Sequence, residues 1–253
     1  MTQRAPRRAR RVYHAPVDPA AARQRPARSP RPRDAATLVL LRDDRRAGPV
    51  VLMGRRRTRD AWSDLYVFPG GRVDRDDHRV RAASELRPEV AARLEAGATP
   101  ARGRAIAIAA IRETFEETGL RIAGRSAGPR PERRSPWRQF AAPDGGGAEG
   151  WAPALDRLHL LCRAVTPPRR AKRFDARFFV TRLDEEHPAP SGNGELGDLR
   201  WIPLSATTKL PLPKITQVVL SLLGERVASG DVSTPPRVPL FKTVHGRHRL
   251  LHH

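Results

Sequence analysis

Cysteine is almost absent from this sequence of 253 residues, which contains Cys162 alone. A single cysteine excludes an intrachain disulfide and a cysteine-based zinc site. Its place in the apolar run Leu160–Cys162 predicts a buried, inert thiol.

Long apolar runs are absent too: none approaches the roughly 20 residues that span a bilayer, and the N-terminus lacks the apolar core of a secretory signal. We therefore expect a cytoplasmic protein without a transmembrane helix.

Lysine is also scarce, since only four of the 48 basic residues are lysine although the net charge is +21. This skew toward arginine, with abundant alanine, proline and glycine, is typical of a GC-rich coding bias rather than of selection for phosphate contacts. Ten arginines lie within residues 1–33 against one acid, Asp18. A nucleic-acid-binding role for this basic N-terminal tail therefore stays open, although nucleic acid is not the partner we expect.

The composition divides the chain into three parts. Residues 1–33 are rich in arginine, proline and alanine and lack periodicity, which predicts a disordered basic tail. Residues 34–230 have enough apolar material for one domain with a core. A long loop or lid is expected there over about 124–154, where proline and glycine are frequent. Residues 231–253 are expected to form a basic C-terminal tail.

Apolar runs bounded by turn residues predict strands in the middle part. These runs cover residues 36–41, 50–53, 66–68, 158–165, 174–182 and 199–203. Helices are predicted at 88–94, at about 104–118 with its end at Gly119, and at 215–227. Strands before and after one strong helix, with another helix late in the chain, predict a mixed α/β sandwich.

The segment Ile108–Leu120 combines an apolar stripe with an acidic face. At roughly 100° per residue, three apolar side chains fall on the stripe that we expect to pack on the sheet: Ile108, Ile111 and Phe115. Glu113, Glu116 and Glu117 fall within an arc of roughly 100° on the opposite side. Three carboxylates this close repel one another, and they lie in the half of the helix where its dipole disfavours negative charge.

A solvated acidic face is a common reason for such a cluster, and this alternative stays open. The rest of the chain is strongly basic, however, so the cluster runs against the composition. A hard divalent cation such as Mg²⁺ or Mn²⁺ prefers oxygen ligands and relieves the repulsion. We therefore predict a metal site on this face of the helix.

The same segment resembles a known motif. Arg112–Leu120 (R-E-T-F-E-E-T-G-L) is similar to the second half of the Nudix box, R-E-U-x-E-E-x-G-U, and Phe68–Gly71 (F-P-G-G) is similar to the loop that opens it. The chain thus resembles the Nudix hydrolase superfamily over about residues 33–225. The resemblance implies an α/β/α sandwich with a mixed sheet. It also implies metal-dependent hydrolysis of a phosphoanhydride bond in a nucleoside-diphosphate-linked compound.

Two features depart from the usual box. The position six residues after the second glycine is Asp77 instead of glutamate, and 34 residues separate Asp77 from Arg112 where the standard box has about seven. An insertion at about residues 78–104 resembles the branch that includes coenzyme A diphosphatases of the peroxisomal type. Further similarity to this branch lies in Arg33–Thr37, Phe68–Asp74, Thr166–Pro168 and Arg173–Phe179. The branch implies coenzyme A or acyl-coenzyme A as the substrate.

The resemblance also implies roles for the residues of the helix. Glu116 and Glu117 match the tandem glutamates of the box and are the expected ligands of Mg²⁺ or Mn²⁺. Glu113 is expected to be a further ligand or the base that orients the attacking water. Arg112 is expected to hold Glu113 in position by a bidentate pair rather than to touch the substrate.

The loop that opens the box has two kinds of candidate. Gly70 and Gly71 lack Cβ atoms and would let main-chain groups approach the metal or a phosphate, although an ordinary turn is the alternative. Asp74 and Asp77 are candidate outer ligands, although acids after a turn are often only solvated.

More distant candidates come from the second half of the chain. Glu195, six residues before Trp201, stands where many family members place an extra ligand or base, with Asp198 as an alternative. Either acid is equally consistent with a loop residue in solvent. Arg173 is a candidate for binding substrate phosphates, together with its basic neighbours Arg169, Arg170 and Lys172.

Two alternatives to this function stay open. The box determines the reaction but not the leaving group, so a nucleotide sugar or a dinucleoside polyphosphate could replace coenzyme A as the substrate. The chain could also be a catalytically inactive Nudix-like module that binds a ligand or nucleic acid. A small-molecule diphosphate is the partner we expect, and a homodimer is an additional possibility.

Overall fold

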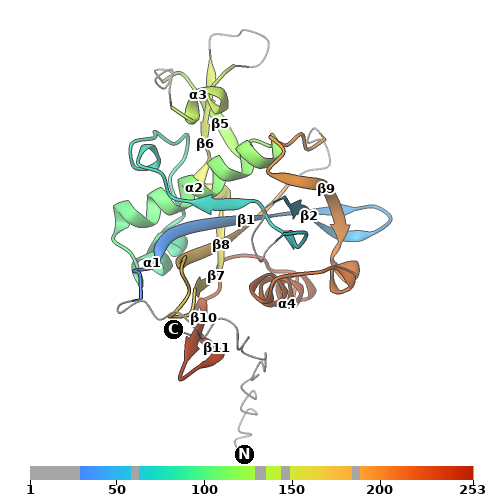
Figure 1. The fold of residues 1–253 in the computed structure, drawn as a ribbon. Helices are drawn as coiled ribbons and strands as arrows, with labels where there is room; N and C mark the ends of the chain where they lie inside the picture. The colour runs from blue at the N-terminus through green and yellow to red at the C-terminus, as the bar shows by residue number, and fades with distance from the viewer. Residues whose placement is uncertain (1–28, 58–62, 129–134, 144–148, 184–188, 253) are drawn as a thin grey trace, which may run out of the picture.

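A computed structural model describes residues 29–57, 63–128, 135–143, 149–183 and 189–252 (Figure 1). The predicted disordered tail lies outside these residues for positions 1–28. The first strand begins at Arg33, one residue before the predicted start of the domain, and Arg33 pairs with Phe174.

A nine-stranded mixed sheet forms the centre of the molecule. Its strands are β1 (Arg33–Asp44), β2 (Gly48–Arg56), β3 (Tyr66–Val67), β4 (Gly70–Arg72), β7 (His159–Val165), β8 (Phe174–Arg182), β9 (Leu196–Pro203), β10 (Pro239–Val244) and β11 (Arg247–His252). The order is β11-β10-β7-β8-β1-β2-β3, with β4 paired to β1 and β9 paired to β2. β1 runs parallel to β8, and the β10–β7 pair is also parallel, whereas the other pairs are antiparallel.

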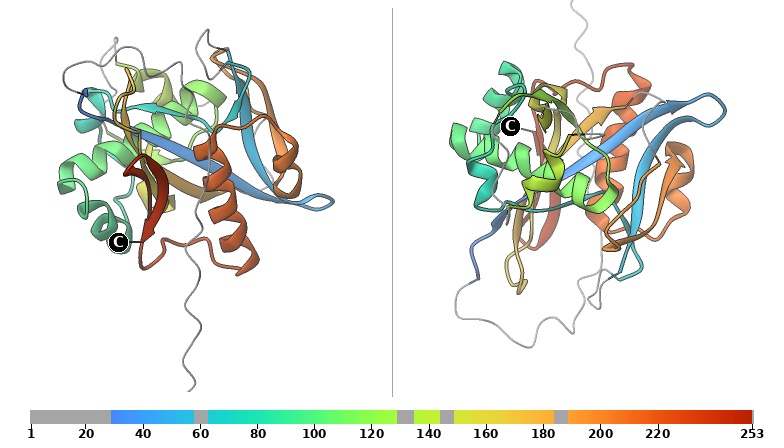
Figure 2. Two further views of the ribbon diagram at one scale, coloured as in Figure 1. Left: turned by 60° about the horizontal axis from the view of Figure 1, so that its bottom comes forward. Right: turned by 90° about the horizontal axis from the view of Figure 1, so that it is seen from above.

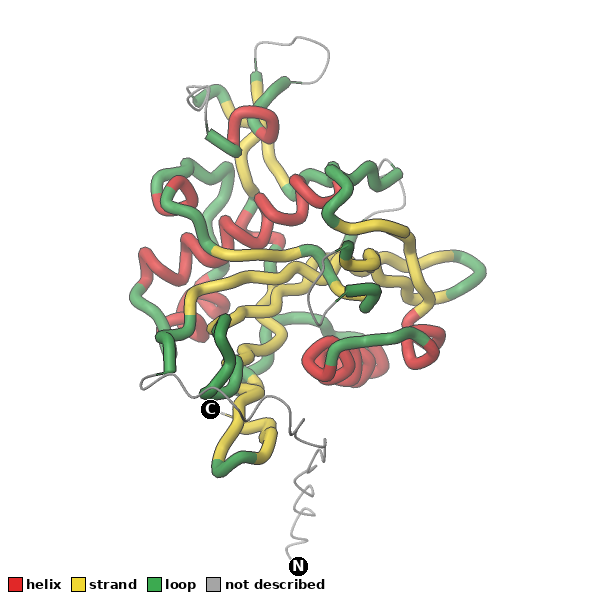
Figure 3. The backbone as a smooth tube through the Cα atoms, in the orientation of Figure 1, coloured by secondary structure: helices red, strands yellow, loops and turns green. Residues whose placement is uncertain are grey.

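Helices cover both faces of this sheet, as Figures 1 and 3 show. α1 (Pro88–Glu95) and α2 (Pro100–Thr118) pack on one face, and α4 (Lys214–Ala228) packs on the other. Alternation along β1 explains the arrangement, because successive side chains of a strand point to opposite faces. Leu38 and Leu40 join the core beneath α2, and Val39 and Leu41 join the core beneath α4. The predicted α/β/α sandwich with a mixed sheet is confirmed.

The chief helix is longer than predicted. α2 begins at Pro100, four residues before the expected start, because the Thr99 hydroxyl accepts a hydrogen bond from the Arg102 N–H and Pro100 occupies the first turn. Its end is as predicted, since Gly119 adopts a left-handed conformation with φ 73°. Within α2, Ile108 and Ile111 are fully buried.

Phe115 packs against the core cluster beneath α2, but only in part. It is half-buried and also meets the ring of Phe140 edge-on, at a centroid distance of 5.3 Å. The apolar stripe of α2 therefore contacts α3 as well as the core at its last turn.

The insertion at about residues 78–104 is a folded part of the domain. It contributes α1 and the first turn of α2, and Val90 and Leu94 of α1 are buried in the core. The predicted helix at 88–94 is confirmed. The insertion thus lengthens α2 at its N-terminal end, away from the glutamates of its last two turns.

The prediction of a loop or lid over residues 124–154 is wrong for the described part. We call residues 121–154 the arm. It holds a hairpin of β5 (Ala123–Ser126) and β6 (Gly150–Pro153), with the short helix α3 (Trp137–Phe140) between them. Proline and glycine favoured a loop locally, but Trp137 and Phe140 are buried and anchor the arm against α2.

The prediction of a C-terminal tail over residues 231–253 is also wrong. β10 and β11 form a hairpin that extends the central sheet, with β10 parallel to β7 (Figure 2). Leu240 and Phe241 are buried, and Phe241 stacks on the ring of His248 at 5.1 Å. The apolar signal is only two residues long and lies among basic residues. The unpaired backbone N–H and C=O groups at the edge of β7 provide hydrogen-bond partners for β10, and the local sequence does not reveal this pairing.

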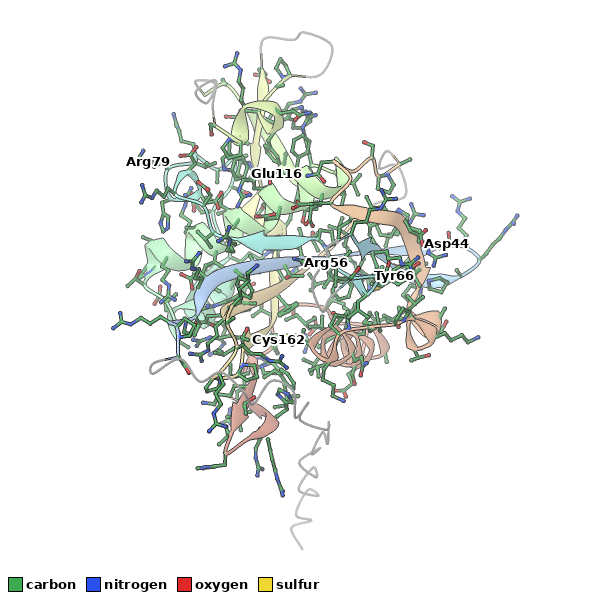
Figure 4. All side chains as sticks on the ribbon, in the orientation of Figure 1. Asp44, Arg56, Tyr66, Arg79, Glu116 and Cys162 are labelled. Atoms are coloured by element: carbon green, nitrogen blue, oxygen red, sulfur yellow. The ribbon has the colours of Figure 1, made fainter. Side chains whose placement is uncertain are left out.

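Two predictions about apolar residues can be compared with the structure. Cys162 is fully buried in β7, and burial raises the pKa of its thiol, as expected for an inert residue (Figure 4). In the part of the chain that the structure describes, no helix is long and apolar enough to cross a membrane.

Candidate active site

The last two turns of α2 bring three glutamates against the loop that opens the motif. Glu117 is buried, with 7% of its surface exposed, and its Oε2 accepts a hydrogen bond of 2.9 Å from the Gly70 N–H. Glu113 and Glu116 are more exposed, and Figure 4 labels Glu116 on α2. The spacing of the sequence thus places all three carboxylates on one face, as predicted from the helical period.

Both glycines are required by close packing. A Cβ atom at Gly71 would stand 2.4–2.5 Å from the carboxylate atoms of Glu113. A Cβ atom at Gly70 would stand 2.4 Å from the backbone oxygen of Ala36. The two residues form β4 beside β1 rather than an ordinary turn. Their lack of side chains lets the main chain approach the carboxylates themselves.

Arg112 is the centre of a buried ion-pair network. Its Nη1 donates to Glu113 Oε1 and to Glu116 Oε2, both at 3.0 Å. Its Nε and Nη2 donate to the two oxygens of Asp77 at 2.9 and 3.1 Å, and Nη2 also donates to the Arg72 carbonyl. The structure therefore joins Arg112 to Glu113, but through one guanidinium nitrogen, whereas the bidentate partner is Asp77.

Asp77 has a different place from the one the sequence indicated. It is completely buried instead of serving as an outer ligand in solvent. Besides Arg112, its carboxylate accepts hydrogen bonds from the Asp74 N–H at 2.7 Å and from Trp137 Nε1 at 3.1 Å. Sequence reasoning misses Trp137, because the proline and glycine residues around it predict a loop and no local pattern indicates its contact with Asp77.

The electrostatics of the face reflect burial and crowding. Burial raises the pKa of Glu117 to about 8, helped by the charges of Glu113 and Glu195 and opposed by the Gly70 hydrogen bond. Burial likewise raises the pKa of Glu113 to about 6, against the attraction of Arg112. The pKa of Glu116 is raised for the same reason. A site that raises the pKa of three neighbouring carboxyls favours a bound cation.

Glu195 lies close enough to this face for its charge to raise the pKa values of all three glutamates. The segment before it is fastened to the end of α2. The Ser191 N–H donates to the Thr118 carbonyl at 2.8 Å, and a Cβ atom at Gly192 would stand 2.4 Å from the Glu117 carbonyl oxygen. Glu195 itself is exposed, so its carboxylate has access to solvent beside the cluster.

Two of the predicted candidates lie elsewhere. Arg173 donates to the carbonyls of Thr166 and Pro30, beside the start of β1. Asp34, the second residue of β1, binds Arg102 in the first turn of α2. Arg102 lies about 22 Å along the helix from Glu117. Arg173 therefore lies away from the three glutamates, and its basic neighbours share its loop.

Asp198 is also outside the site. It accepts a hydrogen bond from the hydroxyl of Tyr66, which belongs to the core beneath α4. Arg200 completes this cluster through a 2.6 Å hydrogen bond to the same hydroxyl. Asp198 lies at an irregularity of the β2–β9 pair, where its backbone is left-handed with φ 47°.

The residues of the face fit a hard divalent cation. Within the described residues, no three acidic, histidine or cysteine side chains are already gathered as a metal site. Arg112 Nη1 holds both Glu113 and Glu116, and the Gly70 N–H holds Glu117. Among the described residues, the hydrogen-bond donor of the buried Glu117 is a backbone N–H, and the charge of Arg56 also favours its anion. Carboxylate oxygens are the ligands that Mg²⁺ and Mn²⁺ prefer.

Comparisons with known proteins agree with this geometry. The model of the NUDIX domain family matches residues 31–222. A NUDIX hydrolase from Alicyclobacillus acidocaldarius is 28% identical, with a TM-score of 0.58, and the match covers 81% of this chain and 99% of that chain. A search of curated proteins found no match.

Two further solved structures show lower similarity. The NUDIX domain of Shewanella oneidensis NrtR, in complex with ADP ribose, is 14% identical with a TM-score of 0.47, covering 83% of this chain and 99% of that chain. A bifunctional NMN adenylyltransferase/ADP ribose pyrophosphatase from Francisella tularensis, in complex with AMP and a manganese ion, is 18% identical with a TM-score of 0.44. That match covers 79% of this chain and 43% of that chain.

The family match extends over most of the chain and includes both β4 and the acidic face of α2. Enzymes of this family generally act on nucleoside-diphosphate-linked compounds and generally use divalent metal ions. The chain belongs to the NUDIX domain family and is a Nudix hydrolase.

Proposed function

We propose that this enzyme hydrolyses the phosphoanhydride bond of coenzyme A or acyl-coenzyme A, with Mg²⁺ or Mn²⁺ held by Glu113, Glu116 and Glu117. One observation carries the metal and the place of the reaction. The buried carboxylate of Glu117 lies beside that of Glu113, with a backbone N–H as its hydrogen-bond donor among the described residues. A buried carboxylate next to a partly buried one is stable as an anion only with a cation beside it.

Each residue of the face then has a role. Glu116, Glu117 and Glu113 supply oxygen ligands, and a bound divalent ion would neutralise charge on the phosphate oxygens of the substrate. Arg112 orients Glu113 and Glu116 through its Nη1. Gly71 leaves space for the Glu113 carboxylate against the main chain.

Water has to lose a proton as it attacks phosphorus, and Glu195 is the base that we propose. It is exposed, it lies near the three glutamates, and no side chain of the described residues holds its carboxylate in an ion pair. Glu113 is the alternative base, but its carboxylate is already bound to Arg112. Loss of the Glu195 carboxylate should therefore lower turnover more than it lowers metal affinity.

The substrate proposal rests on the sequence similarity to the coenzyme A branch. Of the segments that carry it, Arg33–Thr37 forms part of β1, and Arg173–Phe179 forms the start of β8 except for Arg173, which precedes the strand. These segments lie in the sheet, so they support membership of the branch rather than contact with coenzyme A. The identity of the leaving group therefore has to be tested directly.

A hydrolysis screen tests both parts of the proposal. The full chain is incubated with coenzyme A, acetyl-coenzyme A, a nucleotide sugar and a dinucleoside polyphosphate, each with Mg²⁺, Mn²⁺ or excess EDTA. We expect coenzyme A to yield adenosine 3′,5′-bisphosphate and 4′-phosphopantetheine only when metal is present. The Glu117→Gln variant, purified in the same way, controls for contaminating phosphatases.

The outcomes separate the claims. Undiminished hydrolysis in EDTA would show that the metal proposal is wrong. Cleavage of the nucleotide sugar without cleavage of coenzyme A would show that only the substrate proposal is wrong. Absence of cleavage of every substrate would leave a ligand-binding role in place of the proposed reaction.

A further inference from the structure

The carboxylate of Asp77 is bound from four directions in the interior of the protein. Its Oδ1 accepts from Arg112 Nε and from Trp137 Nε1, and its Oδ2 accepts from Arg112 Nη2 and from the Asp74 N–H. Asp77 is 0% exposed and Trp137 is 1% exposed. A buried anion with two donors on each oxygen can neither rotate nor shift without leaving a donor unsatisfied.

The Trp137 indole reaches this position from the arm. Trp137 begins α3, and its ring packs edge-on against Phe140 at a centroid distance of 4.9 Å. Phe140 in turn meets Phe115 on α2, one helical turn from Arg112. The aromatic packing places the indole N–H over Asp77, so a segment far along the chain supports the ion pair of the motif.

Arg112 transmits the position of Asp77 to the acidic face. Two of its nitrogens are held by Asp77, and the third donates to both Glu113 and Glu116. A guanidinium is planar and rigid, so the position of its Asp77 side determines the position of its Nη1 side. Any rotation of Asp77 therefore moves the donor that orients two of the three proposed metal ligands.

We propose that Trp137 is a positioning residue of the active site, which acts through Asp77 and Arg112 on Glu113 and Glu116. This inference rests on the proposed metal-binding role of those glutamates. A tryptophan that served only as core would stabilise the arm, and its indole N–H would be irrelevant to metal affinity. The hydrogen bond to Asp77 therefore distinguishes the two roles.

The test is Trp137→Phe in the full chain, which keeps a ring in the core and removes the N–H donor. Mn²⁺ binding is titrated by electron paramagnetic resonance without substrate, and kcat and KM are measured on the best substrate of the hydrolysis screen. Groups that orient metal ligands typically change metal affinity or activity by about 10–100-fold. We expect a Kd for Mn²⁺ at least about tenfold higher and a similar fall in kcat, with KM changed less than about threefold.

Two matched variants control for packing. Trp151→Phe exchanges an indole for a phenyl ring in β6 of the same arm and leaves the Trp137 donor in place. Phe140→Leu also leaves the donor but loosens the packing that places it, so it should raise the Kd less than Trp137→Phe does. Thermal unfolding shows whether each variant is folded at the assay temperature. An unchanged Kd for Mn²⁺ in folded Trp137→Phe, or an equal increase in Trp151→Phe, would overturn the inference.

A measurement on the unmodified protein covers the case in which Trp137→Phe does not fold. The indole N–H of Trp137 should be protected from hydrogen exchange, because it is buried and bonded to a carboxylate. Complete exchange within the first spectrum would show that the hydrogen bond is not maintained and would also overturn the inference. Failure of the unmodified protein to bind Mn²⁺ would instead contradict the proposed function.

Discussion

Glu117 and Gly70 illustrate how single residues define the site. The glutamate loses most of its hydration on burial and receives one backbone hydrogen bond in return. The residue that donates this bond has to be glycine, because a side chain at position 70 would collide with β1. The carboxylate is thereby fixed beside β4 in a buried place that disfavours its negative charge. A bound cation would relieve that cost.

The first prediction at this scale concerns Glu117→Gln. The substitution keeps the size of the side chain and removes the charge, so turnover should fall by at least about a hundredfold, a barrier increase of roughly 3 kcal/mol. The metal-free protein should melt at an equal or higher temperature, because a buried charge has been removed. Mg²⁺ should raise the melting temperature of the unmodified protein but not of the variant. Glu225→Gln, an exposed glutamate of α4, should change neither quantity.

The second prediction concerns Gly71→Ala. The added methyl group would stand 2.4–2.5 Å from the Glu113 carboxylate, which must move aside. We expect kcat to fall by about tenfold or more while the melting temperature changes little, because the displaced group is the end of a flexible side chain. Gly224→Ala in α4 has no atom within 4 Å of the new methyl and should stabilise the protein by up to about 1 kcal/mol. A fully active Gly71→Ala would contradict the close approach.

At the scale of elements, an arginine cluster attaches the insertion to the sheet. Asp34 of β1 and Asp175 of β8 are neighbours in register, and three arginines surround them: Arg102, Arg163 and Arg177. Arg177 is 2% exposed at its side chain and also donates to the Gly97 carbonyl between α1 and α2. Burial lowers the pKa of Arg177, opposed by the charge of Asp175. The cluster therefore depends on its two acids.

Asp175→Asn tests this dependence. The substitution removes the charge that two arginines share, at 2.8 Å to Arg163 Nε and 2.9 Å to Arg177 Nη1. Breaking a buried pair from one side costs about 3–5 kcal/mol, and urea unfolding should show a loss of about 3 kcal/mol. Asp64→Asn breaks the exposed pair with Arg55 and should cost less than about 1 kcal/mol. Equal losses in the two variants would refute the structural role of the cluster.

At the scale of the whole molecule, the two ends of the chain differ. The C-terminal hairpin adds β10 and β11 to the sheet and buries Leu240 and Phe241. At the other end, the first described contact is the hydroxyl of Ser29, which accepts a hydrogen bond from the Arg169 N–H. The sheet thus includes residues up to His252, well beyond the domain end predicted from the sequence.

A pair of truncations tests this asymmetry. Removal of residues 1–28 should leave the melting temperature and kcat unchanged, because β1 and its contacts from Ser29 onward are retained. Removal of residues 239–253 should lower the melting temperature by several degrees or prevent folding, because it uncovers β7 and the core beneath α4. Loss of folding after the N-terminal truncation would mean that the basic N-terminal tail belongs to the domain.

The sequence by itself determined the features that depend on local periodicity. Alternating and continuous apolar runs predicted six strands of the sheet, and the 3.6-residue period predicted the acidic face of α2. Gly119 marked the end of that helix because its left-handed conformation is a local property. The helical period alone therefore places the three glutamates together on one face of α2.

Only the tertiary structure decided where Asp77, Trp137 and Arg173 lie and what they contact. Asp77 is 35 residues from Arg112 and 60 from Trp137, so no local pattern records that they share one buried cluster. Arg173 looks equivalent to any phosphate-binding arginine in the sequence, but the direction of β8 places it beside the start of β1. The order of the strands in the sheet determines which distant residues meet, and pairing between strands far apart in the chain is a property of the folded molecule as a whole.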